Sequence, residues 1–565
     1  MYILGIWDGH DAGAALLEDD RIVFAANEER FTKRKLEPSF PYHSINAALE
    51  FAGLKHSEIA TIAFSTTELT KTLERIMPYS KEYHYLYRRR KMLKPRYEYL
   101  RRWLRYTLLN FGVVPGNTAT SKFIISRQLR HMGFRNFKLY SIDHHTAHAA
   151  TAAFASGFKN AAVVTLDGLG DGLSGSISTL QNGKLERHVK ISARNSLGVF
   201  FEQVTYLLGM RELEDEGKVM AMADYSYPFE WGANKLKDCV SIEGTGIRMK
   251  YPFNAQLRML DRILWSTPRE QFAYMAQQVL ENAFSSFFEN VLEEYGIGDV
   301  AMAGGTMSNV KANMKIRKLE RLKHWFVFPH MGDGGMAMGA AMYANYLING
   351  TSAYEFDNTY LGNSYTEKQV KDALKKEKGL GFEFESDKSG HAAELISKDH
   401  YVFWFQDRME YGPRALGNRS ILAKADSEQV KDELNLYVKQ REWFQPFAPS
   451  MLENEAEKLL EDVKGHDKYM TMAYEVKDGM RSAMKSVMHV DFTARPQMVG
   501  SENPSYAKLL NGVKKNDGHG VVLNTSFNIH GMPIVMAPED AIATMKKTKT
   551  KYMFIENFFV ENKEA

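Results

Sequence analysis

Two histidines four residues apart stand in a segment rich in alanine. His144 and His148 belong to the string DHHTAHAA, and alanine is the strongest helix former. Positions i and i+4 share one face of a helix, so both imidazoles would point the same way, as the ligands of a divalent metal must. A strand predicted over 161–166 ends in Asp167, whose carboxylate could reach the same ion. The alternative is a helix whose histidines only hydrogen-bond to their neighbours, and spacing alone leaves both interpretations open.

The elements that would position these residues follow one plan twice. In each copy an apolar strand ends in Asp and a Gly-rich turn, and two further strands follow across a polar hairpin. The predicted strands are 2–7, 14–17 and 21–26 in the first copy, and 161–166, 174–180 and 185–191 in the second. We interpret this as an internal duplication of two α/β halves that face a cleft, which resembles the actin-like ATPase architecture. Asp8 and Asp167 would then meet metal-bound phosphate; chance similarity of two hairpins is the alternative.

Two more Gly-rich loops connect strands to helices. A strand over 299–303 leads into GGTMSN, and the loop MGDGG opens a small-residue helix over 336–346. Loops of this kind bind phosphate with their main-chain N–H groups. Asp333 in the second loop adds a third carboxylate, so a nucleotide or metal cleft is predicted. Lys218, in the string EGK, could meet a phosphate or be an ordinary surface lysine.

The chain as a whole has the composition of an ordinary soluble globular protein. Its 565 residues exceed the ~250–300 that one core supports, so more than one domain is expected. A net charge of +3 gives no strong nucleic-acid signal, and Cys239 has no cysteine partner, which fits a reducing compartment. The first residues read as a strand rather than a leader peptide, and no run of about 18 apolar residues could span a membrane. The cytoplasm is the expected location.

A basic and aromatic stretch interrupts the first half. Residues 84–105, within a predicted insertion over 66–130, are helical and rich in Tyr and Arg. Such a stretch can bind nucleic acid, but a solvated helical face with a tyrosine-rich inner side is the simpler explanation. A polyanionic or phosphorylated acceptor is a third possibility.

Cations in the last third of the chain stand in loops beside Gly, Pro, Ser and Asn, not on helix faces. They are Arg414, Arg419, Lys439, Arg441 and Arg495. Because few acids accompany them, they predict a pocket for a phosphate-bearing ligand, with arginine favoured for bidentate contacts.

Nine strings in one order resemble the carbamoyltransferase family that includes nodulation and antibiotic O-carbamoyltransferases. They are GHDAGAAL, DHHTAHAA, LDGLGDG, DEGKVMAMA, AGGTMSN, GDGGMAMGAA, MEYGPRALGNRSIL, REWFQPFAPS and NTSFN. The resemblance implies an α/β protein with a duplicated actin-like (ribonuclease-H-like) ATPase domain over 1–350, similar to tRNA threonylcarbamoyl transferases. It also implies a connecting region over 351–398 and an α+β domain over 399–565 that is similar to threonylcarbamoyl-adenylate synthases.

The family resemblance also implies a two-step reaction. The C-terminal domain would join carbamoyl phosphate and ATP, with Mg²⁺, into carbamoyl-adenylate, releasing pyrophosphate and phosphate. The N-terminal site would then pass the carbamoyl group to the hydroxyl of a small acceptor, and AMP would leave. Neither the acceptor nor the oligomeric state is predicted, although an oligomer is possible; no membrane partner is expected.

Family positions map onto residues of this chain. The implied metal ligands are His144, His148, Asp167 and Asp333, with Fe²⁺ favoured over Zn²⁺ or Mn²⁺. The implied catalytic residues are His144, Asp167, Arg414, Arg419, Lys439 and Arg495. The implied nucleotide contacts are Lys218, Gly304, Gly305, Asn309, Asn524, Ser526 and Asn528. Asp215 or Glu216 is a guess for the base that helps the acceptor hydroxyl.

The chain departs from the family pattern at three places, which puts the fine geometry of the C-terminal site in doubt. Met532 stands at an acidic position, Gln445 at an arginine position, and Phe492 at a glycine position. Two other functions are weighed against O-carbamoyl transfer: a tRNA-modifying threonylcarbamoyl transferase, and a non-catalytic nucleotide-binding module. The second fits poorly with metal and phosphate residues in both domains.

Overall fold

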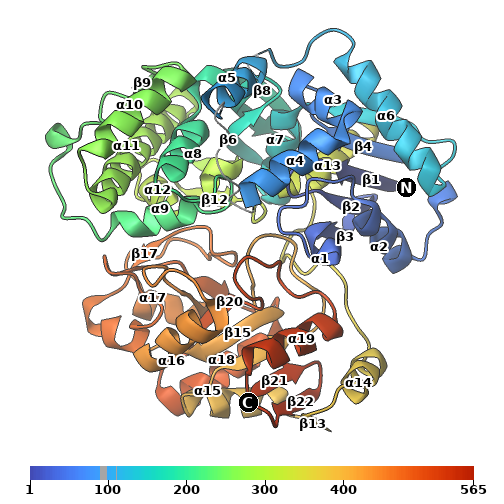
Figure 1. Cartoon of the computed structure of the whole chain (residues 1–565), viewed down its shortest axis with the longest axis vertical. Coiled ribbons are helices and arrows are strands. Elements are labelled where there is room, and N and C mark those ends of the chain that lie inside the picture. The colour runs from blue at the N-terminus through green and yellow to red at the C-terminus, as the bar shows by residue number, and fades with distance from the viewer. Residues whose placement is uncertain (90–97, 110) are drawn as a thin grey trace. The chain divides into compact units, whose positions relative to one another are not determined.

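The computed structural model describes residues 1–89, 98–109 and 111–565 (Figure 1). It forms two compact units, Met1–Glu28 with Leu36–Phe356, and Glu29–Lys35 with Asp357–Ala565. Helices α4 (Pro78–Arg89) and α5 (Glu98–Leu109) lie in the predicted basic stretch, and residues 90–97 of that stretch fall outside the described residues. In the part of the chain that is described, no helix has the length and apolar character needed to cross a membrane.

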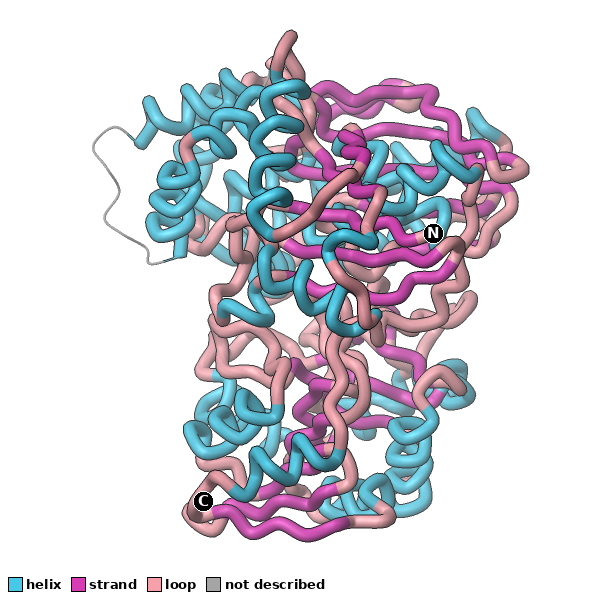
Figure 2. Tube along the Cα trace, turned by 90° about the vertical axis from the view of Figure 1, so that its right-hand side faces the viewer, coloured by secondary structure: helices cyan, strands magenta, loops and turns pink. Residues whose placement is uncertain are grey.

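The first unit contains two five-stranded sheets of the same topology (Figure 2). One has the order β3 (Arg21–Asn27), β2 (Gly13–Glu18), β1 (Tyr2–Trp7), β4 (Thr61–Ser65) and β5 (Lys138–Ile142). The other has the order β8 (Lys184–Ser192), β7 (Leu173–Gln181), β6 (Asn160–Gly170), β11 (Asp299–Ala303) and β12 (His324–Val327). In each, three antiparallel strands precede two strands parallel to the first. The predicted duplication and the actin-like fold are therefore confirmed.

Two helices made largely of small residues pack against each other at the centre of this unit. Helix α13 (Met336–Asn349) contacts β1, β2 and β4 of one sheet, and α7 (His144–Ala155) contacts β6 and β11 of the other. Their alanines and glycines allow the two backbones to approach closely. A Cβ atom built on Gly339 of α13 would lie 2.1 Å from the main-chain oxygen of Ala147 on α7. This contact fixes the position of α7, which carries the two histidines.

We expect Gly339→Ala to lower the free energy of unfolding of the first unit by about 1–3 kcal/mol, because overpacking forces packed backbones apart. Denaturant unfolding followed by circular dichroism would measure it. Gly232→Ala is the matched control, since a Cβ at Gly232 has no neighbouring atom within 4 Å. Equal stability of the two variants would show that α7 and α13 can move apart to accommodate the added methyl group without loss of stability.

The second unit is built on an eight-stranded mixed sheet. Its order is β13 (Leu380–Phe384), β22 (Phe558–Asn562), β21 (Tyr552–Ile555), β14 (Val402–Phe405), β15 (Arg419–Lys424), β20 (Val521–Ser526), β16 (Ala448–Leu452) and β19 (Gln497–Val499). Helices α15 (Lys388–Ser397) and α18 (Pro504–Asp517) pack together on it, and their core with the sheet includes the fully buried Trp404 and Tyr506. Arg414 lies in the loop before β15 and Asn528 in the loop after β20, whereas Asn524 and Ser526 belong to β20 itself.

Residues 357–398, all of which fall in the predicted connecting region over 351–398, lie in the second unit. They form α14 (Glu367–Lys375), β13 and α15, and β13 pairs with β22 at the sheet edge. These elements are difficult to predict from the polar sequence because each buries only one apolar side. On α14 the buried residues are Val370, Ala373 and Leu374. The short helix α1 (Glu29–Thr32) also belongs to this unit.

Candidate functional site

The start of α7 places the two histidines. The carboxylate of Asp143 caps the helix by accepting the main-chain N–H of Thr146 at 2.9 Å, so α7 begins at His144. The alanines that follow keep the helix regular and buried between the sheets. As the spacing predicts, His144 and His148 lie one turn apart on one face, with ring centroids separated by 4.8 Å.

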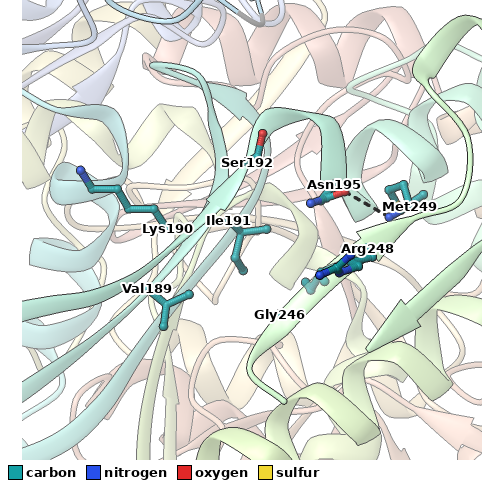
Figure 3. A pocket seen from close by; sticks show the side chains of 9 residues that line it. Val189, Lys190, Ile191, Ser192, Asn195, Gly246, Arg248 and Met249 are labelled. Carbon is teal, nitrogen blue, oxygen red and sulfur yellow. Dashed lines mark hydrogen bonds between the residues drawn. The ribbon is translucent and has the colours of Figure 1, made fainter. Parts of the chain in front are cut away.

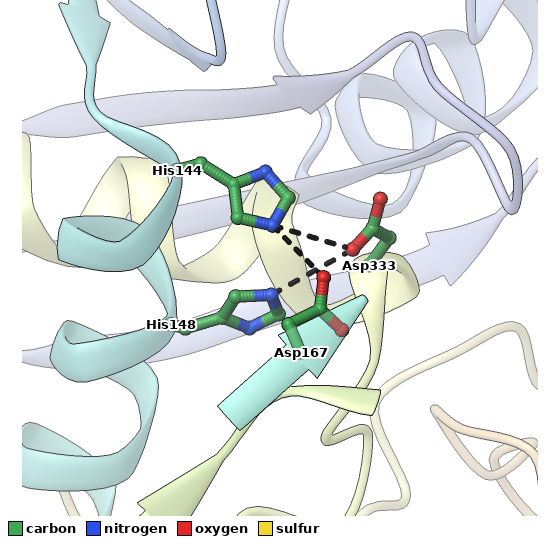
Figure 4. A group of neighbouring side chains, drawn as sticks. All are labelled: His144, His148, Asp167 and Asp333. Atoms are coloured by element: carbon green, nitrogen blue, oxygen red, sulfur yellow. Dashed lines mark hydrogen bonds and ion pairs between the residues drawn. The ribbon is translucent and has the colours of Figure 1, made fainter. Parts of the chain in front are cut away.

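Four buried side chains meet beside this face of α7 (Figure 4). His144, His148, Asp167 and Asp333 each offer one ligand atom, and these atoms lie within 4.8 Å of one another. His144 Nε2 is 3.3 Å from Asp167 Oδ2, and the Nε2 atoms of both histidines are 3.6 Å from Asp333 Oδ1. Two imidazole nitrogens and two carboxylates form a common ligand set for divalent transition metals. The group could therefore hold a metal ion.

The side chain of His148 is consistent with a bound metal ion. Its Nε2 atom is buried, points toward Asp333, and has no hydrogen-bond partner among the described residues (Figure 4). An unsatisfied buried polar atom costs about 1–3 kcal/mol, and a metal would use its lone pair. His144 binds Thr66 through its other nitrogen, Nδ1, at 2.9 Å from Thr66 Oγ1. That contact fixes the ring so that Nε2 faces the carboxylates.

Charges within the group keep both carboxylates ionised. Burial by itself would raise the pKa of Asp167, but its hydrogen bond to His144 and the charges of the histidines hold that pKa below the usual range. Burial would also raise the pKa of Asp333, which His10 and His144 lower. Burial opposes the charged form of His144, yet Asp333 and Asp167 outweigh it and raise the pKa of His144 to about 10. The group thus has the anionic character that a cation needs.

We expect Thr66→Val to weaken divalent-metal binding by about 10–100-fold, because loss of a ligand's outer hydrogen bond has effects of this size. Thr66 has a φ of 67°, a rare conformation for a β-branched residue, and valine preserves its shape. Metal titration by calorimetry would measure the change. Thr165→Val is the matched control, because Thr165 Oγ1 contacts His145, which lies outside the group of four. Equal weakening in both variants would contradict an orienting role for Thr66.

In the second unit, Lys439 gathers two of the predicted polar residues. It is the last residue of the π-helix Leu434–Lys439. Its Nζ donates to Asn528 Oδ1 at 2.6 Å and to the main-chain oxygen of Ser526 at 2.7 Å. Burial and then the charge of Arg441 lower the pKa of Lys439 well below its usual range. Asn524 instead donates to Ala415 O, inside the loop.

Two other cations of the second unit, both arginines, lack an acidic partner. Arg414 and Arg495 are half-buried and make no hydrogen bond or ion pair with the residues that the structure describes. Burial lowers the pKa of Arg414 to about 10. Burial, then the charge of Arg414, lowers the pKa of Arg495, and only Asp467 acts in the opposite direction. Like charges held together without matching acids are the signature of a polyanion site.

Arg419 differs from these arginines. Its side chain is fully buried, stacks on Phe405 at 3.5 Å, and donates to main-chain oxygens that include those of Gln406 and Asp407. The guanidinium thus supports the loop, and little of it is left for a ligand. The carboxylate of Glu410 holds the same loop by accepting three main-chain N–H groups, from Leu416, Asn418 and Arg419.

With these two groups described, comparison with known proteins decides the family. Residues 2–342 match the family model for the carbamoyltransferase N-terminus, and residues 393–562 match the one for the carbamoyltransferase C-terminus. The chain belongs to the carbamoyltransferase family.

Three relatives of this carbamoyltransferase illustrate the range of the family. An uncharacterized protein of Methanocaldococcus jannaschii is 35% identical over 467 residues, which cover 78% of this chain and 76% of that protein. The nodulation protein NolNO of Sinorhizobium fredii is 29% identical, covering 98% and 79%. The 3'-hydroxymethylcephem-O-carbamoyltransferase of Streptomyces clavuligerus is 30% identical, covering 59% and 62%.

The predicted nucleotide contacts in the first unit of the carbamoyltransferase make internal bonds. Gly304 has a φ of 101° and passes so close to Leu166 that a Cβ would lie 2.1 Å from its main-chain oxygen. The N–H of Gly305 donates to Asp167 Oδ1 at 2.7 Å and so holds one of the four clustered groups. Asn309 caps α12 (Val310–Arg317), and its amide bonds to Gln277. Lys218 lies 2.9 Å from Asp215.

The expectation that Asp8 meets metal-bound phosphate is not supported by its contacts. Both of its carboxylate oxygens accept hydrogen bonds from Arg75, at 2.8 and 2.9 Å. Sequence reasoning missed this arginine because it comes from the insertion. It also missed His10, whose Nε2 lies 3.5 Å from Asp333 Oδ2. His10 could have been found from the string DGHDAG, which places a histidine among polar and glycine residues directly after the first strand.

Neither residue guessed as the base belongs to the group of four. Asp215 forms the ion pair with Lys218 and accepts the N–H of Arg211. Glu216 accepts the N–H of Leu213 at 2.7 Å, and burial raises the pKa of Glu216 to about 8.

A hollow of about 450 Å³ lies in the first unit, between the end of β8 and the hairpin of β9 (Val240–Glu243) and β10 (Gly246–Met249) (Figure 3). It contains none of the predicted site residues, and its Arg248 is paired with Glu243 at 2.8 Å. The hollow therefore adds no catalytic group.

Proposed function

We propose that this carbamoyltransferase makes carbamoyl-adenylate in its second unit and transfers the carbamoyl group to an acceptor hydroxyl in its first unit. The observation that carries the proposal is the set of cations in the second unit, where Arg414 and Arg495 lack acidic partners and Lys439 is buried. A relative named as an O-carbamoyltransferase supports the hydroxyl acceptor.

The first half-reaction suits those cations. Carbamoyl phosphate and water give carbamate and phosphate; the carbamate oxygen then attacks the α-phosphorus of ATP, and pyrophosphate leaves. Negative charge on transferring phosphoryl groups is stabilised by preorganised cations in a site poor in water. Arg414 and Arg495 would bind phosphate oxygens through their guanidinium forks, and Lys439, with Ser526 and Asn528, would border the pocket. ATP would bring Mg²⁺ as its companion ion.

The second half-reaction suits the group on α7. A divalent ion would be held by His144, His148, Asp167 and Asp333. We favour Fe²⁺, with Zn²⁺ or Mn²⁺ as alternatives. When bound, the ion would polarise the adenylate phosphate without redox change. Thr66 orients His144, and the N–H of Gly305 orients Asp167. The acceptor oxygen forms a bond to the carbamoyl carbon, the bond from that carbon to the phosphate oxygen breaks, AMP leaves, and the hydroxyl proton passes to water.

Pyrophosphate release tests the proposal. The protein is incubated with ATP, Mg²⁺ and carbamoyl phosphate, and a parallel reaction omits carbamoyl phosphate. The expected result is pyrophosphate release that depends on carbamoyl phosphate and needs no acceptor. Release at the rate of the control would show that no carbamoyl-adenylate is made.

Two arginines of α5 give no support to a tRNA-modifying activity. Arg102 donates to Glu212 at 2.6 Å, and Arg105 lies 3.6 Å from Glu202. These arginines of α5 are thus matched by acids within the first unit, so they do not form a basic face for nucleic acid.

A further inference from the structure

Three cations of the insertion converge on Asp8, which follows β1. Helix α3 (Leu69–Ile76) supplies Lys71 and Arg75, which are four residues apart and share one helix face, and α4 supplies Lys81. Arg75 is hydrogen-bonded to both carboxylate oxygens of Asp8, while the two lysines lie farther from that carboxylate. The two lysines are left with no carboxylate of their own at hydrogen-bond distance.

Both lysines donate to one neutral atom, the main-chain oxygen of Asp8. The distances are 2.7 Å from Lys71 Nζ and 2.5 Å from Lys81 Nζ. The carboxylate oxygens of Asp8 and Glu74 lie 3.6–3.8 Å from these ammonium groups, beyond a hydrogen bond. Lys81 has one more acceptor, the main-chain oxygen of Pro38 at 3.2 Å. Since an ammonium group has three N–H donors, donors on both lysines remain unused within the described part of the chain.

Holding two ammonium groups this close is unfavourable in a buried place. The side chains of Lys71 and Lys81 are only 6% and 11% exposed. Burial lowers the pKa of Lys71 to about 7, although the charge of Asp8 opposes that shift. An anion between the two ammonium groups would take up the unused donors and offset the repulsion.

The pair of lysines lies close to the group of four. The ring of Trp7 connects them, because Lys71 Nζ is 4.8 Å from its centroid and the His144 ring is 6.1 Å away. His10, two residues after Asp8, reaches Asp333. An anion held by the lysines would therefore lie beside the place where the carbamoyl group is transferred.

We propose that Lys71 and Lys81 bind an anionic group of the acceptor, so that the acceptor is a hydroxyl compound bearing a phosphate or a carboxylate. The identity of this site as the acceptor site rests on the proposed function. Carbamoyl-adenylate also brings a phosphate to the first unit, so the experiment must separate an anionic acceptor from the nucleotide.

Competitive acetylation of lysines tests the proposal residue by residue. The full chain is treated with N-hydroxysuccinimidyl acetate, and mass spectrometry follows labelling of Lys71, Lys81 and the exposed control Lys159. The ligands are matched pairs, glycerol with glycerol 3-phosphate and glucose with glucose 6-phosphate or glucuronate, and, separately, AMP. We expect the anionic members to slow labelling of Lys71 and Lys81 by about tenfold, the neutral members to have no effect, and Lys159 to react equally throughout.

Two outcomes would overturn the proposal. Protection by AMP alone would assign the lysines to the nucleotide, and equal labelling with every ligand would show that no anion binds there. This measurement needs no catalysis, so its failure is distinguishable from absence of pyrophosphate release, which would instead remove the proposed function.

Variants extend the test to catalysis. Carbamoyl transfer to an anionic acceptor should fall by about 100-fold in the Lys71→Gln/Lys81→Gln double variant, because each lost charge-assisted hydrogen bond costs roughly tenfold. Lys71→Arg, which keeps the charge, should retain most of the transfer, and Lys159→Gln should retain all of it. Acceptor-free pyrophosphate release should stay unchanged in each folded variant. An equal fall with the neutral member of a pair would count against recognition of the anion.

Discussion

Arg414→Ala is expected to lower pyrophosphate release from ATP and carbamoyl phosphate by about 100–1000-fold, the usual effect of removing one preorganised donor from a charge-stabilising site. Arg414 is half-buried, and no described carboxylate pairs with it. Its guanidinium is therefore available to a ligand. A coupled enzymatic assay for pyrophosphate measures the loss.

Two further variants sharpen this result. Arg414→Lys keeps the charge but loses the planar fork, so an intermediate rate is expected if bidentate phosphate contact matters. Arg481→Ala is the matched control, because Arg481 already pairs with Asp478 and stacks on Phe492. Bound metal should be unchanged in all three variants. A rate for Arg414→Ala close to that of the control would remove Arg414 from the phosphate site.

Local patterns in the sequence predicted the fold of the first unit well. Alternation of apolar strands with Gly-rich turns is a short-range signal, and it placed the strands within a few residues of those observed. The convergence of His144, His148, Asp167 and Asp333 also followed from local rules. Helical spacing put two imidazoles on one face, and two carboxylates came from one sheet, Asp167 from near the end of β6 and Asp333 from the loop that follows β12.

Long-range partners could not be predicted in this way. Asp8 and Asp167 end equivalent strands, yet Asp8 is bound by Arg75, because an insertion present in one half alone carries that arginine against it. Arg414 and Arg419 stand in one motif, five residues apart, but only Arg419 faces the carbonyl groups of the preceding loop. Whether a cation is hydrogen-bonded within the protein or remains available to a ligand depends on which backbone carbonyl groups lie near it in space. The types of the neighbouring residues in the sequence do not predict this.

The unmatched cations define the difference between the two units. In the second unit Arg414, Arg495 and Lys439 come from three separate segments, and burial lowers the pKa of each; the charge of Arg414 lowers the pKa of Arg495 further, and the charge of Arg441 lowers that of Lys439. In the first unit, by contrast, two histidines stand beside two carboxylates. A cationic pocket suits a polyanionic substrate, and a mixed nitrogen and carboxylate set suits a divalent ion. The contrast in charge is why separate half-reactions are proposed for the two units.

His148→Ala should therefore abolish carbamoyl transfer while sparing pyrophosphate release. Loss of an ion that polarises the adenylate phosphate is worth several kcal/mol, on the order of 1000-fold in rate. Inductively coupled plasma mass spectrometry of the dialysed variant should show that its content of divalent metal is a small fraction of the content of the unaltered protein. Transfer is followed as AMP release that depends on an acceptor.

The neighbouring histidine provides the control for this variant. His145 is buried on the same helix, but its Nδ1 contacts Thr165 Oγ1 and it lies outside the group of four. His145→Gln should keep both metal and transfer, apart from a modest loss of stability. Retention of metal by His148→Ala would contradict the proposed ligand set. Removal of a metal ligand on α7 should leave the phosphate pocket of the second unit intact. Equal loss of transfer and pyrophosphate release would therefore contradict the division of the reaction between two sites.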